Sequence, residues 1–195
     1  MNSKAKTTDK ISASVFKNDF HTEGARGGGI FYFTCYDKDG NLKWEDQAKN
    51  IVVNTGLQDM NTKYFKGSAY TAAWYLGLVN DSAFVGYNAG DTLASHSDWT
   101  EDTNYSGSNR ITAVFGTATT AAPSVINNAV ATGGTVAVFS MNGTTTIKGA
   151  FLTNIQDRSN NTGLLFSVAN FTGGDRAVVS GDTLNVTYEF SLNDA

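Results

Sequence analysis

The chain has a single cysteine and a single proline among its 195 residues. One cysteine excludes an intrachain disulfide. Because Cys35 lies in the apolar run 30–36, a small buried side chain is favoured over a reactive or metal-binding thiol. Pro123 falls between two expected strands, where its missing N–H disturbs no ladder. Packing and hydrogen bonds, rather than disulfides, must therefore hold the fold together.

Charge is also scarce, since Asp, Glu, Lys and Arg make up 16% of the chain and the net charge is −4. Globular domains usually carry about a quarter of charged residues. No cluster of Lys and Arg of the kind that follows a phosphate backbone is visible, so the sequence predicts no nucleic-acid binding. Gly, Ser, Thr and Asn replace the charges, and this composition suits a protein held among neighbours better than a free cytosolic enzyme.

Long apolar runs are missing as well. No stretch approaches the roughly 20 apolar residues of a membrane helix, and the first ten residues lack the apolar segment of a signal peptide. We therefore expect no membrane partner and synthesis in a cytoplasm. Neither a Gly-x-Ser-x-Gly elbow nor a glycine loop opening a helix occurs. A Ser-His-Asp triad using His96 is formally possible but has no support in spacing, so we expect neither catalysis nor a cofactor.

Runs of β-branched and aromatic residues predict a mainly β protein. In 183–192, Leu184, Val186 and Tyr188 alternate with polar residues and should face the core, as should Phe190 and Leu192. The other expected strands are 30–36, 42–45 (with 51–53 as a candidate extension), 73–79, 110–117, 125–131, 135–141, 145–152 and 164–168. Gly133-Gly134 and Asn142-Gly143 predict hairpin turns. Together these patterns predict a single antiparallel β-sandwich domain, jelly-roll-like, over residues 29–195.

One short helix is predicted from Thr55, as N-cap, to Phe65. Leu57, Met60 and Tyr64 would form its narrow apolar face. Gly67 would end it as a C-cap glycine.

Residues 1–28 predict an extended N-terminal arm, because they are polar, mildly basic and too poor in apolar residues to fold alone. Val15, Phe16 and Phe20 interrupt this polarity. These three side chains either pack back on the domain or anchor the arm on a partner, and the sequence leaves both alternatives open.

Four potential cation ligands lie close together in a polar loop: Asp91, His96, Asp98 and Glu101. Their spacing matches no known metal-binding loop. A simpler interpretation is favoured, in which Asp91 caps a turn at 92–94, His96 hydrogen-bonds within the loop and Trp99 packs on the sandwich. We therefore expect no metal. In the preceding loop, Phe84, Val85 and Tyr87 lie between Gly and Asn residues and are the candidates for a contact with another subunit.

Three motifs occur together in the middle of the chain: N-x-V-x-N-x-G-L from Asn50, W-Y-x-G-L from Trp74 and D-T-L-A-S-H-x-x-W-T-E from Asp91, with a tyrosine and an arginine following. As a set they resemble a recurrent family of tailed-bacteriophage structural proteins. In that family the Trp-Thr-Glu, Tyr and Arg recur together, which implies a structural loop lock formed here by Trp99, Glu101, Tyr105 and Arg110. Two departures from the family pattern are Asp98 and an insertion at 83–90.

The resemblance implies a non-enzymatic virion protein. A capsid decoration (cement) protein is the favoured function, bound as a homotrimer to the major capsid protein on the outer surface of the head, with the arm laid over a neighbour. The alternatives are a tail or head-fibre adhesin that binds the host surface, and a connector of the neck or tail. No stalk, long repeat or coiled coil supports the fibre alternative.

Overall fold

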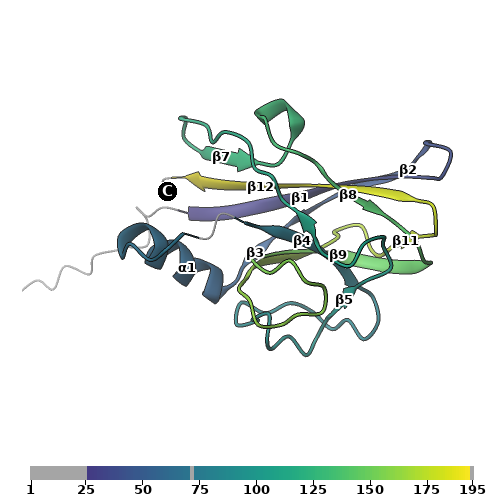
Figure 1. Cartoon of the computed structure of the whole chain (residues 1–195), viewed down its shortest axis with the longest axis horizontal. Coiled ribbons are helices and arrows are strands. Elements are labelled where there is room, and N and C mark those ends of the chain that lie inside the picture. The colour runs from purple at the N-terminus through teal and green to yellow at the C-terminus, as the bar shows by residue number, and fades with distance from the viewer. Residues whose placement is uncertain (1–25, 71–72, 194–195) are drawn as a thin grey trace, which may run out of the picture.

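This computed structural model describes residues 26–70 and 73–193, whose strands form two antiparallel sheets (Figure 1). The first sheet contains β1 (Arg26–Tyr36), β2 (Leu42–Lys49), β7 (Ser124–Asn127), β8 (Ala137–Ser140) and β12 (Thr183–Asn193). The second sheet contains β3 (Ile51–Val52), β4 (Tyr75–Asn80), β5 (Thr100–Asp102), β6 (Ile111–Thr112), β9 (Thr145–Thr153), β10 (Leu165–Asn170) and β11 (Arg176–Val178). The predicted β-sandwich is confirmed.

The first and last strands form the backbone of the first sheet. β1 pairs with β12 over its whole length, and β2 covers the other edge of β1. As predicted, Leu184, Val186 and Tyr188 of β12 are buried, whereas Leu192 is exposed near the end of the strand. β1 begins at Arg26, so residues 26–28, predicted as part of the arm, belong to the sheet. Val15, Phe16 and Phe20 lie outside the described residues.

Two predicted hairpins are wrong, because the strands on either side of each turn do not pair with each other. Asn142-Gly143 connects β8, which pairs with β12, to β9, which belongs to the other sheet. β7 and β8 lie one after the other along β12 instead of pairing with each other. Between them is a 3₁₀ turn, η1 (Val130–Thr132), which ends at Gly133 with φ 85°. The candidate extension at 51–53 also crosses sheets, since β3 pairs with β10.

The core lies between the two sheets. Phe31, Phe33 and Phe139 from the first sheet face Leu76 and Leu152 from the second, in one contiguous cluster of buried side chains. A second cluster covers the opposite face of the second sheet, where the segment 81–99 folds over β4, β9 and β10. Burial on both faces explains why β9 and β10 are nearly continuous apolar runs instead of alternating.

The helix α1 (Asn54–Phe65) lies at one end of the sandwich, beside the start of β1 and the end of β12 (Figure 1). Its N-cap is Val53, while the hydroxyl of Thr55 donates to the Leu165 carbonyl at 3.0 Å, so the predicted Thr55 cap is wrong. Gly67 has φ 70° just after the helix, the conformation expected of a C-terminal glycine. α1 closes one end of the core without entering it deeply.

Candidate functional site

An apolar cavity of about 200 Å³ opens at the α1 end of the sandwich, between the helix and both sheets. Met60 contributes from α1, and the side chains that shape the remainder include Trp74, Phe115, Ile126, Phe166 and Phe190. Its lining residues come from elements far apart in sequence, so the cavity cannot be predicted from the pattern of any one segment. We call this cavity, with its rim, the α1 groove.

The walls of the α1 groove are aromatic rings that hold one another edge to face. The rings of Trp74 and Phe166 lie 5.2 Å apart, and those of Phe166 and Phe190 lie 5.6 Å apart. The hydroxyl of Tyr188 accepts a hydrogen bond from the Asn50 amide at 2.9 Å. Edge-to-face packing keeps these rings rigid. The groove is therefore suited to an apolar side chain, and its lining supplies no array of converging acids and bases.

Polar side chains on the rim come from the helix. Asp59 and Lys63 line the groove and form an i,i+4 ion pair, with 4.0 Å between the Lys63 Nζ and the Asp59 Oδ1. This pair is long and only partly exposed, so it adds little stability. The Lys63 Nζ also donates to the Ala69 carbonyl at 2.5 Å, which leaves the Asp59 carboxylate as the less engaged of the two charges.

Exposed aromatic side chains continue the apolar surface beyond the groove. Tyr64 is 84%, Phe65 79% and Tyr70 71% exposed, and the rings of Tyr64 and Phe65 lie 5.0 Å apart. The prediction that Leu57 and Tyr64 form the buried face of the helix is wrong, because both are exposed. Contiguous exposed apolar surface is typical of a site of interaction.

The predicted loop lock forms around the buried guanidinium of Arg110. Its Nε and Nη2 donate to both carboxylate oxygens of Glu101, at 2.8 and 2.9 Å. The remaining donors reach the carbonyls of Ile155, at 3.0 Å, and Asn160, at 3.1 Å. The backbone N–H of Ser159 donates to the same carboxylate at 2.8 Å. The ion pair thus joins β5 to the segment after it, and the hydrogen bonds of its two members hold the loop between β9 and β10.

Tyr105 and Trp99, the other two residues of the predicted lock, are both fully buried. The ring of Tyr105 packs edge-on against Phe139 at 4.9 Å and beneath the guanidinium of Arg158 at 4.8 Å. Trp99 lies on Phe151 in the second core cluster, with 5.3 Å between the rings. These contacts place all four residues in the interior of the loop region.

The four potential cation ligands are engaged with protein groups instead of with one another. Asp91 does not cap a turn as predicted, because its carboxylate accepts from the Trp99 indole at 3.0 Å. His96 stacks on Trp99 at 3.8 Å, and its Nδ1 lies 3.0 Å from the Trp99 carbonyl oxygen. Asp98 accepts from the Asn88 amide at 3.2 Å. Within residues 26–70 and 73–193, no group of three acidic, His or Cys side chains is arranged to hold a metal ion.

The three predicted contact residues of the 81–90 loop have different surroundings. Tyr87 donates from its hydroxyl to the Ala169 carbonyl at 3.1 Å, and Phe84 packs on the Tyr87 ring at 4.9 Å. Burial raises the pKa of the Tyr87 hydroxyl strongly. Val85, at the tip, is 80% exposed. Most of this loop therefore packs on its own sheet, and Val85 is the side chain of the three left for another molecule.

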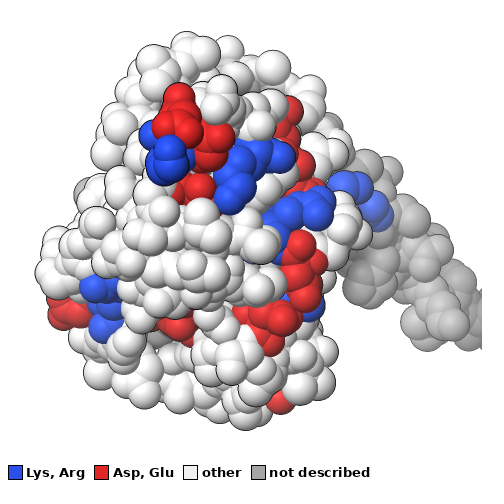
Figure 2. Space-filling model, turned by 90° about the vertical axis from the view of Figure 1, so that its right-hand side faces the viewer, with Lys and Arg blue, Asp and Glu red and all other residues white. Residues whose placement is uncertain are grey.

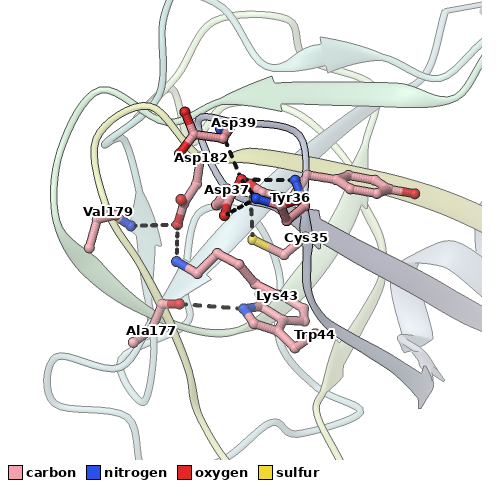
Figure 3. Close-up of polar contacts among 10 residues, drawn as sticks. Cys35, Tyr36, Asp37, Asp39, Lys43, Trp44, Ala177, Val179 and Asp182 are labelled. Atoms are coloured by element: carbon pink, nitrogen blue, oxygen red, sulfur yellow. Dashed lines mark hydrogen bonds and ion pairs between the residues drawn. The ribbon is translucent and has the colours of Figure 1, made fainter.

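At the other end of the sandwich, a buried ionic contact closes the β1–β2 turn onto the turn before β12 (Figure 3). Lys43 forms an ion pair with Asp182, whose side chain is almost completely buried. The N–H of Val179 donates to the same carboxylate at 2.9 Å, and the Trp44 indole donates to the Ala177 carbonyl at 3.4 Å. Because the Asp182 carboxylate is already engaged by Lys43 and by the Val179 N–H, this contact is structural, and we call it the Lys43–Asp182 clamp.

Charges of both signs lie side by side on the face shown in Figure 2, and most of that face is uncharged. Ion pairs among the described residues join strands and turns, such as Arg176 with Asp46 at 2.6 Å and Lys148 with Asp175 at 2.5 Å. This face therefore presents no field of a single sign. In the part of the chain that is described, no helix is long and apolar enough to cross a bilayer.

Comparisons with protein-family models, with curated proteins and with solved structures give no significant match. Sequence reasoning missed the α1 groove and also the buried network around Asp102, which accepts from Asn80 and Thr145 at 2.6 Å. The only available signal was the run of aromatics Tyr64, Phe65 and Tyr70 around the end of the helix.

Proposed function

We propose that the protein is a non-enzymatic structural component of a tailed-phage virion, with capsid decoration as its role. The observation that carries this proposal is the motif set Trp99-Thr100-Glu101, Tyr105 and Arg110, which resembles phage structural proteins. The lock that these residues form holds a loop in place, as a structural role requires.

The architecture supports the same role. A sandwich with core side chains on both faces of one sheet is a rigid block, and Tyr64, Phe65 and Tyr70 offer exposed aromatic surface at its α1 end. Three copies around a local three-fold axis would bridge neighbouring copies of the major capsid protein, with the segment before β1 reaching an adjacent subunit.

Decoration would stabilise a head by mass action. A protein that binds the assembled shell but not its separate subunits shifts the equilibrium towards the shell. Several weak contacts made by one oligomer act at high effective concentration, so the avidity exceeds the strength of each contact. An arm that orders only on docking adds selectivity for the finished surface.

Copy number in purified particles tests this role. A decoration protein is present in hundreds of copies per head, as quantified by mass spectrometry against the major capsid protein of the same particles. Six to eighteen copies would contradict decoration and would favour the neck, tail or fibre.

Adhesion to the host surface is the second candidate function, favoured by the exposure of Tyr64 and Tyr70. Aromatic rings with a polar edge are common at recognition surfaces. Binding of the purified protein to host cells, abolished in the double variant Tyr64→Ser, Tyr70→Ser but retained in Val130→Ser, would support this second function. Val130 is a suitable control because it is 72% exposed.

A further inference from the structure

The α1 groove has an occupant within the chain itself: we propose that the phenyl ring of Phe20 inserts into it, so that the N-terminal segment is strapped to its own sandwich. This inference does not depend on the proposed function. The groove is described, whereas residues 1–25 lie outside the described part of the chain. Size, reach and charge support the assignment.

Size limits the occupant to one aromatic ring. The groove measures about 200 Å³ and is lined by rings and aliphatic side chains. An apolar cavity of roughly 150 Å³ is already sufficient to bind benzene. A phenyl ring therefore fits, and it would meet Trp74, Phe166 and Phe190 at their faces and edges, the arrangement that aromatic clusters prefer.

Reach favours the same chain over a second copy. Gly29 of β1 pairs with Phe190, which lines the groove. β1 therefore passes beside the groove three residues after Arg26, a distance of about 10 Å along the strand. Five residues lie between Phe20 and Arg26, and the six steps from one to the other span up to about 20 Å, enough to turn back to the groove. So short a tether holds Phe20 at an effective concentration of roughly millimolar, far above that of a second copy in dilute solution.

Charge favours the segment around Phe20. Lys17 and Asp19 lie just before it in the sequence. The rim of the groove carries Asp59 and Lys63, whose own ion pair is long at 4.0 Å. Each arm charge thus has an opposite charge on the rim: Asp59 for Lys17, and for Asp19 the ammonium of Lys63, which also donates to the Ala69 carbonyl. Anchoring at Phe20 leaves the residues before it free to reach another molecule.

Photochemical labelling tests the contact directly. The full-length chain carrying p-azidophenylalanine in place of Phe20 is irradiated at low micromolar concentration, and the adducts are mapped by mass spectrometry. We expect adducts within one chain, on the peptides that contain Met60 or Trp74. The same probe in place of Thr7 serves as the control and should not label these peptides. Absence of groove adducts from position 20, or adducts only between two chains, would overturn the proposal.

Thermal unfolding gives a second, independent readout. Phe20→Ala should lower the unfolding temperature by about 4 °C, because the groove is left without the phenyl ring. Phe20→Leu should lower it by about half as much, because leucine fills part of the same space. Phe65→Ala is the matched control, since it removes an equal ring from an exposed position and should change the temperature by less than about 1 °C. An unchanged unfolding temperature in Phe20→Ala would also overturn the proposal.

Discussion

At the scale of the residue, buried polar side chains determine how the long loops of this protein are held. Arg110 is 3% exposed and uses its guanidinium to connect Glu101 with two carbonyls of a distant loop. Its positive charge also lies 5.1 Å from the centre of the Phe151 ring. A single side chain therefore connects β5 with the loop between β9 and β10.

Loss of this guanidinium should be costly. Arg110→Ala leaves the Glu101 carboxylate with little exposure and no counter-charge, so we expect the free energy of unfolding to fall by about 3–5 kcal/mol. The matched control is Lys38→Ala, which breaks the exposed pair with Asp39 and should cost less than about 1 kcal/mol. Urea unfolding measures both. Equal losses in the two variants would show that burial of the Arg110 pair is energetically irrelevant.

Cys35 provides a pH-dependent prediction. Burial raises the pKa of its thiol to about 11, with the nearby Asp182 adding to the effect and Lys43 opposing it (Figure 3). Below about pH 9 the thiol is neutral in both the folded and unfolded chain. Between about pH 9 and 11 the unfolded chain loses the proton while the folded chain keeps it, so stability must fall as the pH rises.

We expect this thiol alone to lower the free energy of unfolding by about 2 kcal/mol between pH 9 and 11. Urea unfolding of the wild type and of Cys35→Ala at several pH values separates its contribution from that of the buried tyrosines, which both proteins share. Parallel pH profiles for the two proteins would contradict the assignment.

At the scale of the element, α1 is positioned by a glycine and not by an apolar face. A Cβ on Gly56 would lie 2.5 Å from the Phe166 carbonyl oxygen, so the first helical turn contacts β10 through its backbone. Most of the following large side chains of the helix remain exposed. This close approach also explains how a short, polar helix stays on the sandwich.

Gly56→Ala should therefore destabilise the protein by about 1–3 kcal/mol, although alanine favours a helix over glycine by about 1 kcal/mol. Asn61→Ala, at an exposed position of the same helix, shows the propensity effect alone and should raise stability by about 0.5 kcal/mol. Thermal unfolding followed by circular dichroism compares the two. A stabilising Gly56→Ala would mean that the helix does not dock as closely as described.

The elements differ in how far sequence predicted them. Alternation identified β12 because one of its faces is in the core. The short β5 and β11, with three residues each, were missed because a strand of that length has no periodicity to detect. The turn Asn142-Gly143 suggested a hairpin, since local turn chemistry does not reveal that the chain is crossing between sheets.

The candidate site was predictable only where its residues interact within one segment. The Glu101–Arg110 pair spans nine positions and was expected from sequence. The α1 groove was not, because Met60, Ile126 and Phe190 meet only in the folded chain.

At the scale of the whole molecule, the protein is a sandwich that is polar and closed at one end and apolar at the other. The Lys43–Asp182 clamp closes the β1–β2 end, whereas the α1 groove and its aromatic rim lie where β1 begins. Charges of both signs are mixed on the face in Figure 2, so long-range attraction of one sign does not favour that face. We therefore propose the exposed aromatic rim at the α1 end, with Tyr64, Phe65 and Tyr70, as the surface that would contact a partner.

The most direct test of the account is reconstitution on phage heads that lack this protein. Purified protein is added to such heads, and its bound copies are counted while the temperature at which the heads disrupt is recorded. Heads that already carry the protein are the control. The account predicts saturable binding at hundreds of copies per head together with a higher disruption temperature. Absence of saturable binding, or saturation with no change in that temperature, would contradict it.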